Sequence, residues 1–313
     1  MDYSLCFKDK IDNLINYLQN NNIKAMILGI SGGIDSTVCA AICHEVSKRT
    51  GIPLIGRSLP TMHNKEGEVT TAYLVGKTFC NDYKVFDLDI PYRKFAHAIT
   101  FSEGLLDQSG PFDFDKSGPK QTDLANGNIQ ARLRMIYLYN LASIHKGIVI
   151  DTDNLTEHYL GYWTLHGDVG DYKPIGDLWK TEVFGLAEWL KNWYGCYTHT
   201  YFYTDSPEEI EHKQGNLYKA RSIRDSLKLQ PTAGLGITDS DLDELGAESY
   251  EQVDNILKEI LAWKQLSQKR GDYPITIEEQ KEAFLEEQQM LDTPIEIIIN
   301  VVNRHFNSEF KRK

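Results

Sequence analysis

The chain has 313 residues, a formal net charge of −12 and 41% hydrophobic residues. This composition is that of an ordinary globular protein, and it excludes a disordered, collagen-like or coiled-coil chain. An acidic chain repels a phosphate backbone, so nucleic acid is not expected as a partner. The first residues do not form a secretory signal and no apolar run is long enough to cross a bilayer. We therefore expect a cytoplasmic protein that does not enter a membrane.

The cysteines are few and scattered, with five in the chain, which is typical of reduced thiols in the cytoplasm. Cys39 and Cys43 lie four residues apart on a predicted helix. A zinc site is the weaker interpretation of this pair, and two small buried side chains are the better one.

The first half of the chain alternates between helical and strand-like patterns. The first predicted element is a helix with Ile11, Leu14, Ile15 and Leu18 on one face, which ends at Asn21 and Asn22. Strands are predicted at Lys24–Ile30, Ile52–Arg57, Tyr83–Ile90 and Gly147–Asp151. The helices between them are predicted from about Ile34, at Lys65–Cys80, after Pro91 and at Gly127–His145, and a loop is predicted at 104–126. This alternation requires parallel strands joined by helical crossovers, so the predicted fold class is α/β with a doubly wound parallel sheet flanked by helices.

The second half is predicted to be mainly helical. Helical patterns cover Leu178–Trp193, Ser240–Gln268 and Ile277–Phe306. We expect a single domain over residues 1–313, with a core at about 7–236 and a helical, acidic C-terminal extension with its tail at about 237–313.

A glycine-rich turn follows the first strand, with the sequence G-I-S-G-G-I-D-S-T at Gly29–Thr37. Small residues let backbone N–H groups approach an anion, and the following helix N-terminus favours negative charge. The turn lacks the lysine of a Walker A loop and the spacing of G-x-G-x-x-G. An aspartate inside a phosphate loop requires a cation, so Asp35 points to Mg²⁺ between protein and phosphates. The alternative is a tight turn in which Asp35 or Ser36 caps the helix.

Two later segments carry further polar groups. Asn128 and Arg132 are four residues apart and share one face of the fourth predicted crossover helix, where Ile129, Leu133 and Ile136 form an apolar stripe. This helix is predicted to be mostly buried, so its arginines need partners. The segment Asp151–Glu157 follows the fourth strand at its carboxyl end, where ligands of open parallel sheets collect. A capping box of Asn154 and Glu157 is the alternative there.

The loop S-G-G-x-D-S at Ser31–Ser36 resembles the pyrophosphate loop of the ATP pyrophosphatase (PP-loop) superfamily. Further segments follow in order: N-x-x-A-R-x-R at Asn128–Arg134, T-D-x-x-x-E at Thr152–Glu157, G-D-x-G at Gly167–Gly170, Lys180, P-T-A-x-L at Pro231–Leu235 and S-E-F-K-R at Ser308–Arg312. Together, from about residue 7 to 313, they resemble the ammonia-dependent NAD synthetase family.

The resemblance implies an adenine nucleotide alpha hydrolase-like fold and a carbon–nitrogen ligase. ATP would activate deamido-NAD as an acyl-adenylate, and ammonia would convert it to NAD with release of AMP and pyrophosphate. Carried over, the ATP-binding residues are Gly29, Ser31, Gly32, Gly33, Asp35, Ser36, Arg57, Thr152, Lys180 and Thr232, and the Mg²⁺ ligands are Asp35 and Glu157. The substrate-binding residues are Asn128, Arg132, Asp168, Asp171, Phe310 and Lys311, and the catalytic ones are Asp35, Glu157, Asp168 and Lys180.

Two further expectations concern assembly and the nitrogen source. The resemblance implies a homodimer, and Met135, Tyr137 and Tyr139 are available to cover a partner. Only about two dozen residues precede Lys24, too few for a glutamine amidase domain, so free ammonia is the expected nitrogen source.

This chain departs from the family pattern at three positions. Leu165 stands where the family has a lysine before G-D-x-G, Phe310 replaces the tail histidine, and Asp151 replaces a glycine. Amidation of nicotinate mononucleotide or another small carboxylate on the same scaffold therefore remains an alternative. A tRNA-modifying enzyme is disfavoured by the charge of −12 and the lack of paired catalytic cysteines. A non-enzymatic nucleotide-binding regulator is disfavoured because carboxylates around phosphate only repel it without a metal.

Overall fold

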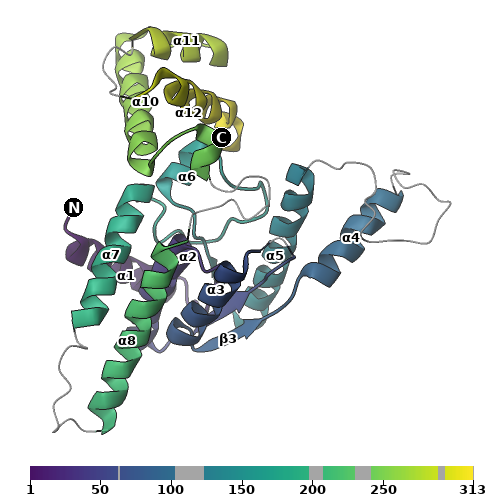
Figure 1. Ribbon diagram of the computed structural model, residues 1–313, viewed down its shortest axis with the longest axis vertical. Helices are drawn as coiled ribbons and strands as arrows, with labels where there is room; N and C mark the ends of the chain where they lie inside the picture. The colour runs from purple at the N-terminus through teal and green to yellow at the C-terminus, as the bar shows by residue number, and fades with distance from the viewer. Residues whose placement is uncertain (63, 103–122, 197–206, 230–240, 288–292, 313) are drawn as a thin grey trace.

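Four short parallel strands form the centre of the fold, in the order β3-β2-β1-β4. In the computed structural model (Figure 1), the described residues are 1–62, 64–102, 123–196, 207–229, 241–287 and 293–312. The strands are β1 (Met26–Gly29), β2 (Leu54–Ser58), β3 (Asp82–Val85) and β4 (Ile148–Ile150). In their register, Met26 lies opposite both Leu54 and Ile148. The predicted doubly wound parallel sheet is confirmed.

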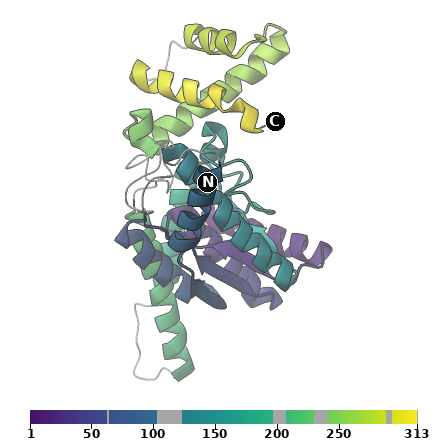
Figure 2. The same cartoon turned by 90° about the vertical axis from the view of Figure 1, so that its right-hand side faces the viewer.

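Helices cover both faces of this sheet. Successive side chains of a strand point to opposite faces, and successive residues of β1 are apolar, so both faces must be covered. Met26 and Leu28 pack on one face against α1 (Tyr3–Asn20), α2 (Ile34–Thr50), α3 (Glu66–Phe79), α7 (Lys180–Cys196) and α8 (Pro207–Leu227). Ile27 points to the other face, toward α5 (Asp123–His145), on which α4 (Asp89–Ser102) packs. Figures 1 and 2 show the two helical layers on opposite sides of the strands. Cys39 and Cys43 are buried free thiols on α2, as the better of the two interpretations predicted.

Four expectations for β3, α4 and α5 need correction. The third strand ends at Val85, and α4 begins at Asp89 rather than after Pro91. Proline is tolerated there because the first turn of a helix has no intrahelical use for its N–H. Helix α5 begins at Asp123 rather than at Gly127, and the rest of the predicted 104–126 loop, 104–122, lies outside the described residues. Ile136, placed in the core stripe from its spacing, is 56% exposed.

The C-terminal helices form a second hydrophobic cluster of their own. They are α9 (Asp241–Leu245), α10 (Tyr250–Arg270), α11 (Ile277–Glu287), α12 (Ile295–Asn307) and a short 3₁₀ turn η1 (Glu309–Arg312). Leu160 of α6 (Leu155–Leu160) joins this cluster to the rest of the molecule. The helical pattern predicted at Ser240–Gln268 is divided at Gly246, where φ is 66°, and α12 starts only after Pro294. None of the helices in the described ranges is long and apolar enough to span a membrane.

Candidate functional site

A cavity opens at the carboxyl ends of β1 and β4, where the order of the sheet reverses. Chain connection runs from β1 through α2 to β2 on one side, and β4 lies on the other side of β1. Ligands of open α/β sheets bind at such switch points. The cavity lining includes the predicted site residues Gly29, Ser31, Asp35, Ser36, Arg57, Thr152, Glu157 and Asp168. The glycine-rich turn and the segment after β4 are therefore brought together as the sequence predicts.

The turn between β1 and α2 leaves its backbone open to a ligand. Gly32 has a φ of 88°, and a Cβ atom there would lie 2.4 Å from the Glu68 carbonyl oxygen, so only glycine fits. Gly33 is the N-cap of α2 and makes no side-chain cap hydrogen bond, while the Ser36 hydroxyl donates back to the Gly33 carbonyl at 3.0 Å. The alternative in which Asp35 or Ser36 caps this helix is therefore wrong. The N–H groups of its first turn remain available for an anion.

Lys180 lies at the centre of a buried ionic cluster next to this turn. Its ammonium donates to Asp35 at 2.6 Å and to Glu157 at 2.8 Å, and its side chain is 1% exposed. The Asn154 side-chain amide donates to the other oxygen of Asp35 at 2.8 Å. Three segments far apart in the sequence, from α2, α6 and α7, thus meet at one cation.

Glu157 has two roles at once. One carboxylate oxygen accepts from the Asn154 backbone N–H at 3.2 Å and closes the capping box of α6, which was the alternative reading of this segment. The other oxygen accepts from Lys180. The cap therefore orients the carboxylate toward the cluster, and the two interpretations are compatible.

The cluster changes the protonation of its members. Burial raises the pKa of Glu157 to about 7, and the nearby Asp35 carboxylate adds to this rise, while Lys180 opposes it. Burial lowers the pKa of Lys180, but Asp35 and Glu157 outweigh this effect and hold its pKa well above the usual value. Lys180 therefore stays charged, and Glu157 titrates near neutrality.

A second acidic group, which sequence reasoning mostly missed, lies beside the first. Asp151 accepts from the backbone N–H groups of Gly170 and Asp153, both at 2.8 Å. Lys173 pairs with Asp151 at 3.1 Å and with Asp153 at 3.3 Å. Burial, with Asp151 next in effect, raises the pKa of Asp153 well above its usual range. The signal available in the sequence was the placement of two aspartates, 151 and 153, directly after a buried strand.

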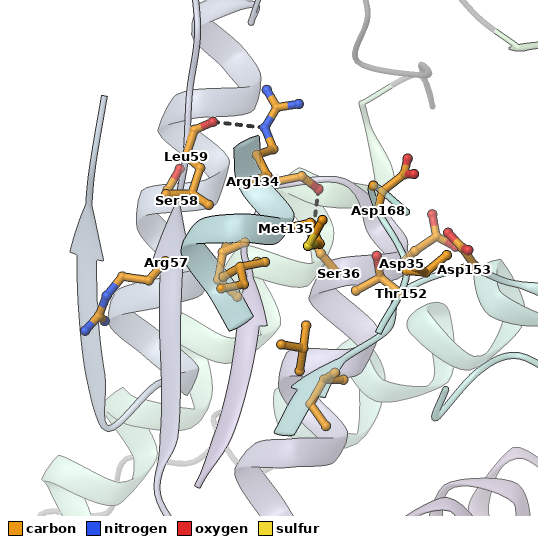
Figure 3. A pocket seen from close by; sticks show the side chains of 18 of the residues that line it. Asp35, Ser36, Arg57, Ser58, Leu59, Arg134, Met135, Thr152, Asp153 and Asp168 are labelled. Carbon is orange, nitrogen blue, oxygen red and sulfur yellow. Dashed lines mark hydrogen bonds between the residues drawn. The ribbon is translucent and has the colours of Figure 1, made fainter. Parts of the chain in front are cut away.

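Asp168 is the predicted catalytic residue nearest to this second group. It lines the cavity and accepts from the Thr164 backbone N–H at 2.6 Å. Burial raises its pKa, and hydrogen bonds from backbone N–H groups partly oppose this rise. Figure 3 shows Asp35, Asp153 and Asp168 on one side of the pocket.

The other side of the pocket carries Arg134, which the sequence analysis quoted only as part of a motif. Its Nε donates to the Leu59 carbonyl at 3.1 Å, and its guanidinium lies across the pocket from the aspartates (Figure 3). Arg57, predicted to bind ATP, directs its guanidinium away from them and pairs with Asp82 at 2.7 Å. Of the two arginines that line the pocket among the described residues, Arg134 is therefore the one opposite the row of carboxylates.

The predicted substrate residues are engaged within the chain. Asn128 accepts from the Thr164 hydroxyl at 2.8 Å, and the exposed Arg132 donates to the Leu165 carbonyl at 3.3 Å. Asp171 accepts from the Tyr139 hydroxyl at 3.1 Å and from the Val149 backbone N–H at 2.9 Å, which ties it to β4.

The predicted tail residues, Phe310 and Lys311, lie near the C-terminal end of α6, whereas Glu157 lies near its N-terminal end. Phe310 is exposed, and the Lys311 ammonium donates to the carbonyls of Gly161 at 2.7 Å and Trp163 at 2.6 Å. Arg312 donates to a carbonyl in the last turn of α6 itself, that of Tyr159, at 2.8 Å. The tail therefore holds the end of α6 and the segment that follows it. Thr232, predicted to bind ATP, lies outside the described residues.

A parallel sheet whose first strand runs into an S-G-G-x-D-S turn, with the aspartate of that turn and a glutamate both bound to one buried lysine, defines a nucleotide-binding protein of the PP-loop class. A family model described as NAD synthase matches residues 6–313. The chain belongs to the NAD synthase family, and it is a carbon–nitrogen ligase that uses ATP as co-substrate.

Individual relatives agree with this assignment. The NH(3)-dependent NAD(+) synthetases of Methanococcoides burtonii and Methanocaldococcus jannaschii are each 30% identical to this chain. The alignment with the first relative covers 80% of this chain and 78% of that protein. The alignment with the second covers 77% of this chain and 75% of that protein. Among solved structures, that of NMN synthetase from Francisella tularensis superposes with a TM-score of 0.67 at 23% identity, over 100% of this chain and 97% of that one. At this identity the structural likeness concerns the fold.

Proposed function

We propose that this enzyme amidates deamido-NAD with free ammonia to give NAD. A carboxylate oxygen of the substrate attacks the α-phosphorus of ATP, and the bond to pyrophosphate breaks. Ammonia then attacks the acyl carbon, AMP leaves, and one proton is released. The observation that carries the proposal is the buried cluster of Asp35, Glu157 and Lys180 beside an uncapped helix N-terminus, because this arrangement suits a departing pyrophosphate.

We further propose that Asp35 and Glu157 would hold Mg²⁺ together with the ATP phosphates. The donor set fits, since two carboxylates converge on a point that already accommodates a cation, the Lys180 ammonium. Carboxylate and phosphate oxygens are the ligands that a hard cation prefers. When bound, the metal supplies charge neutralisation for the pyrophosphate.

Lys180 and Asp168 would take the two remaining tasks. Lys180 is charged throughout the neutral range and would donate to a phosphate oxygen of ATP. Asp168 lines the same cavity, and its raised pKa suits a carboxylate that accepts a proton from ammonium. Arg134, on the opposite wall, offers a bidentate donor to the substrate carboxylate or phosphate. We expect Asn128, Arg132, Asp171, Phe310 and Lys311 to border the dinucleotide.

Pyrophosphate release by the purified enzyme tests the proposal. We expect release that depends on ATP, deamido-NAD and ammonium together, and formation of NAD in equal amount. Glutamine in place of ammonium serves as the control and should support little turnover. Faster turnover with nicotinate mononucleotide would transfer the assignment to that substrate, and release independent of any carboxylate would refute it.

We also propose a homodimer, formed through the layer of α4 and α5. The three residues first considered for the interface are used within the chain: Met135 lines the cavity, Tyr137 stacks on Phe86, and Tyr139 bonds to Asp171. Among the side chains of these helices whose exposure the structure describes, four other large apolar ones are exposed, namely Ile90, Phe95, Ile136 and Ile144. A paired face would cover them. Sedimentation should show a dimer at micromolar protein, and Ile136→Asp with Ile144→Asp should shift it to monomer.

We place the enzyme in the cytoplasm, because its co-substrate ATP and its free thiols both fit that compartment.

A further inference from the structure

Helix α10 of the C-terminal extension lies against the N-terminal ends of α6 and α7. These two helices carry Glu157 and Lys180, and Figure 1 shows α10 directly beyond them. Asp254 of α10 is 0% exposed and points between them. The extension therefore contacts the ionic cluster through residues that immediately adjoin it.

The Asp254 carboxylate joins the residues next to Glu157 and Lys180. One oxygen accepts from the hydroxyl of Thr156, which precedes Glu157. The other accepts from the backbone N–H and the hydroxyl of Thr181, which follows Lys180, at 3.0 and 2.7 Å. A single side chain thus fixes the first turns of two helices relative to each other.

Thr156 completes the link between the two helices. Its hydroxyl oxygen accepts from the Lys180 backbone N–H at 2.8 Å while its proton goes to Asp254. No ion pair of the described residues includes Asp254, so hydrogen bonds satisfy this buried charge. The N-terminal end of α7 adds a favourable dipole. Such charge-assisted bonds are short and directional, which suits a role in alignment.

Tyr250 contacts the cluster from the same face of α10. It lies four residues before Asp254, and its ring centroid is 5.5 Å from the Lys180 ammonium. The Tyr250 hydroxyl donates to Asp241 at 3.3 Å, and Asp241 also lines the cavity. Two residues of α10 therefore act on Lys180. Asp254 binds Thr181, the residue that follows this lysine in the chain, and the Tyr250 ring lies next to its ammonium group.

We propose that Asp254 is a positioning residue, which sets Lys180 and Glu157 in the geometry that receives the ATP phosphates. The proposal rests on the proposed function only in that ATP binds at this cluster. The helical extension is then part of the ATP site rather than an appendage. Its effect should fall on ATP and not on the carboxylate substrate. Within the described residues, the side-chain hydrogen bonds of Asp254 go to the chain neighbours of Glu157 and Lys180 and to none of the residues expected to border the dinucleotide.

The variant Asp254→Asn removes the charge and keeps the shape. Its amide cannot accept both Thr181 donors and the Thr156 proton together. We expect the Kd of ATP, measured by calorimetry with Mg²⁺ and no carboxylate substrate, to rise about tenfold or more, the loss of one charge-assisted bond. The KM for ATP should rise likewise, while the KM for deamido-NAD stays within about twofold. Thr181→Val, which deletes one hydroxyl without a change of shape, should shift ATP binding in the same direction by less.

Ser267→Ala is the matched control. Ser267 is also buried on α10, but it bonds to Asp272 at the far end of the helix. The Ser267→Ala protein should be less stable than the wild type but bind ATP with unchanged affinity. Unchanged ATP affinity in both Asp254→Asn and Thr181→Val, or an equal loss in Ser267→Ala, would overturn the proposal. A wild-type enzyme that binds ATP but does not act on deamido-NAD would refute the proposed substrate and leave this test intact.

Discussion

Replacement of Lys180 by methionine should destabilise the folded protein to a degree that depends on pH. Lys180 is the buried cation between Asp35 and Glu157, whose side chains are only 16% and 18% exposed. The loss of one partner of a buried ion pair costs about 3–5 kcal/mol, because the remaining charge stays unpaired. We expect Lys180→Met to lose about 3 kcal/mol at pH 6.

The pH dependence follows from Glu157. Its folded pKa, about 7, lies above the unfolded value, so the stability it contributes is present at low pH and is lost as the pH rises to 7. In the wild type this loss ends near pH 7. Without Lys180, which lowers the pKa of Glu157, the folded pKa moves higher and the loss continues. The destabilisation should therefore grow by up to about 1.4 kcal/mol per pH unit above pH 7.

Urea unfolding of both proteins at pH 6 and pH 8.5, without nucleotide or Mg²⁺, measures this difference. Lys281→Met is the matched control, because Lys281 pairs at 2.9 Å with an exposed carboxylate, that of Glu278. Such a pair is worth about 0–1 kcal/mol and should show no such trend. A cost for Lys180→Met below about 1 kcal/mol, or an equal cost at both pH values, would refute this account of the cluster.

Three further predictions concern the metal, the tail and the C-terminal cluster. Asp35→Asn should keep the fold, reduce turnover on the order of a hundredfold and flatten its dependence on Mg²⁺; an unchanged Mg²⁺ titration would remove Asp35 from the ligand set. Lys311→Ala frees the Gly161 and Trp163 carbonyls and should raise the KM for deamido-NAD on the order of tenfold with that for ATP unchanged, whereas wild-type kinetics would show that the tail does not act on the site. Burial lowers the pKa of His305 to about 2, so its neutral form contributes stability that is lost as the pH falls below 6.5. His305→Asn keeps a donor for the Tyr159 carbonyl but has no group that titrates. Between pH 7.5 and pH 5.5 the variant should therefore lose about 1.4 kcal/mol less stability than the wild type. Parallel curves of stability against pH for the two proteins would contradict this.

The glycine-rich turn after β1 could be predicted from the sequence because its causes are local. About a dozen residues contain all of these causes: a buried strand, small residues that allow a φ of 88° at Gly32, and the start of a helix. The capping box at Asn154 and Glu157 was equally visible. What the spacing could not show is that the second oxygen of Glu157 reaches Lys180, because this depends on how α6 packs beside α7.

The positions that escaped prediction depend on distant partners. Asp254 lies next to the apolar stripe of α10, and its three donors come from Thr156 and Thr181 on two other helices. Ile136 fits a helical stripe by spacing but faces outward, since the sheet covers only part of α5. Periodicity finds the apolar positions of a helix, and only the neighbouring elements decide which of them are buried.

The ionic cluster also has a consequence for the order of folding. The contact of Asp35 with Lys180 closes 145 residues of chain, and that of Thr156 with Asp254 closes 98. Contacts of such long range carry a large loop-closure entropy, so we expect them to form after the local helices and the β1–α2–β2 unit. Substitutions in the cluster should therefore accelerate unfolding more than they slow refolding. We therefore expect the proposed ATP site to assemble late, and bound nucleotide to slow the first step of its loss.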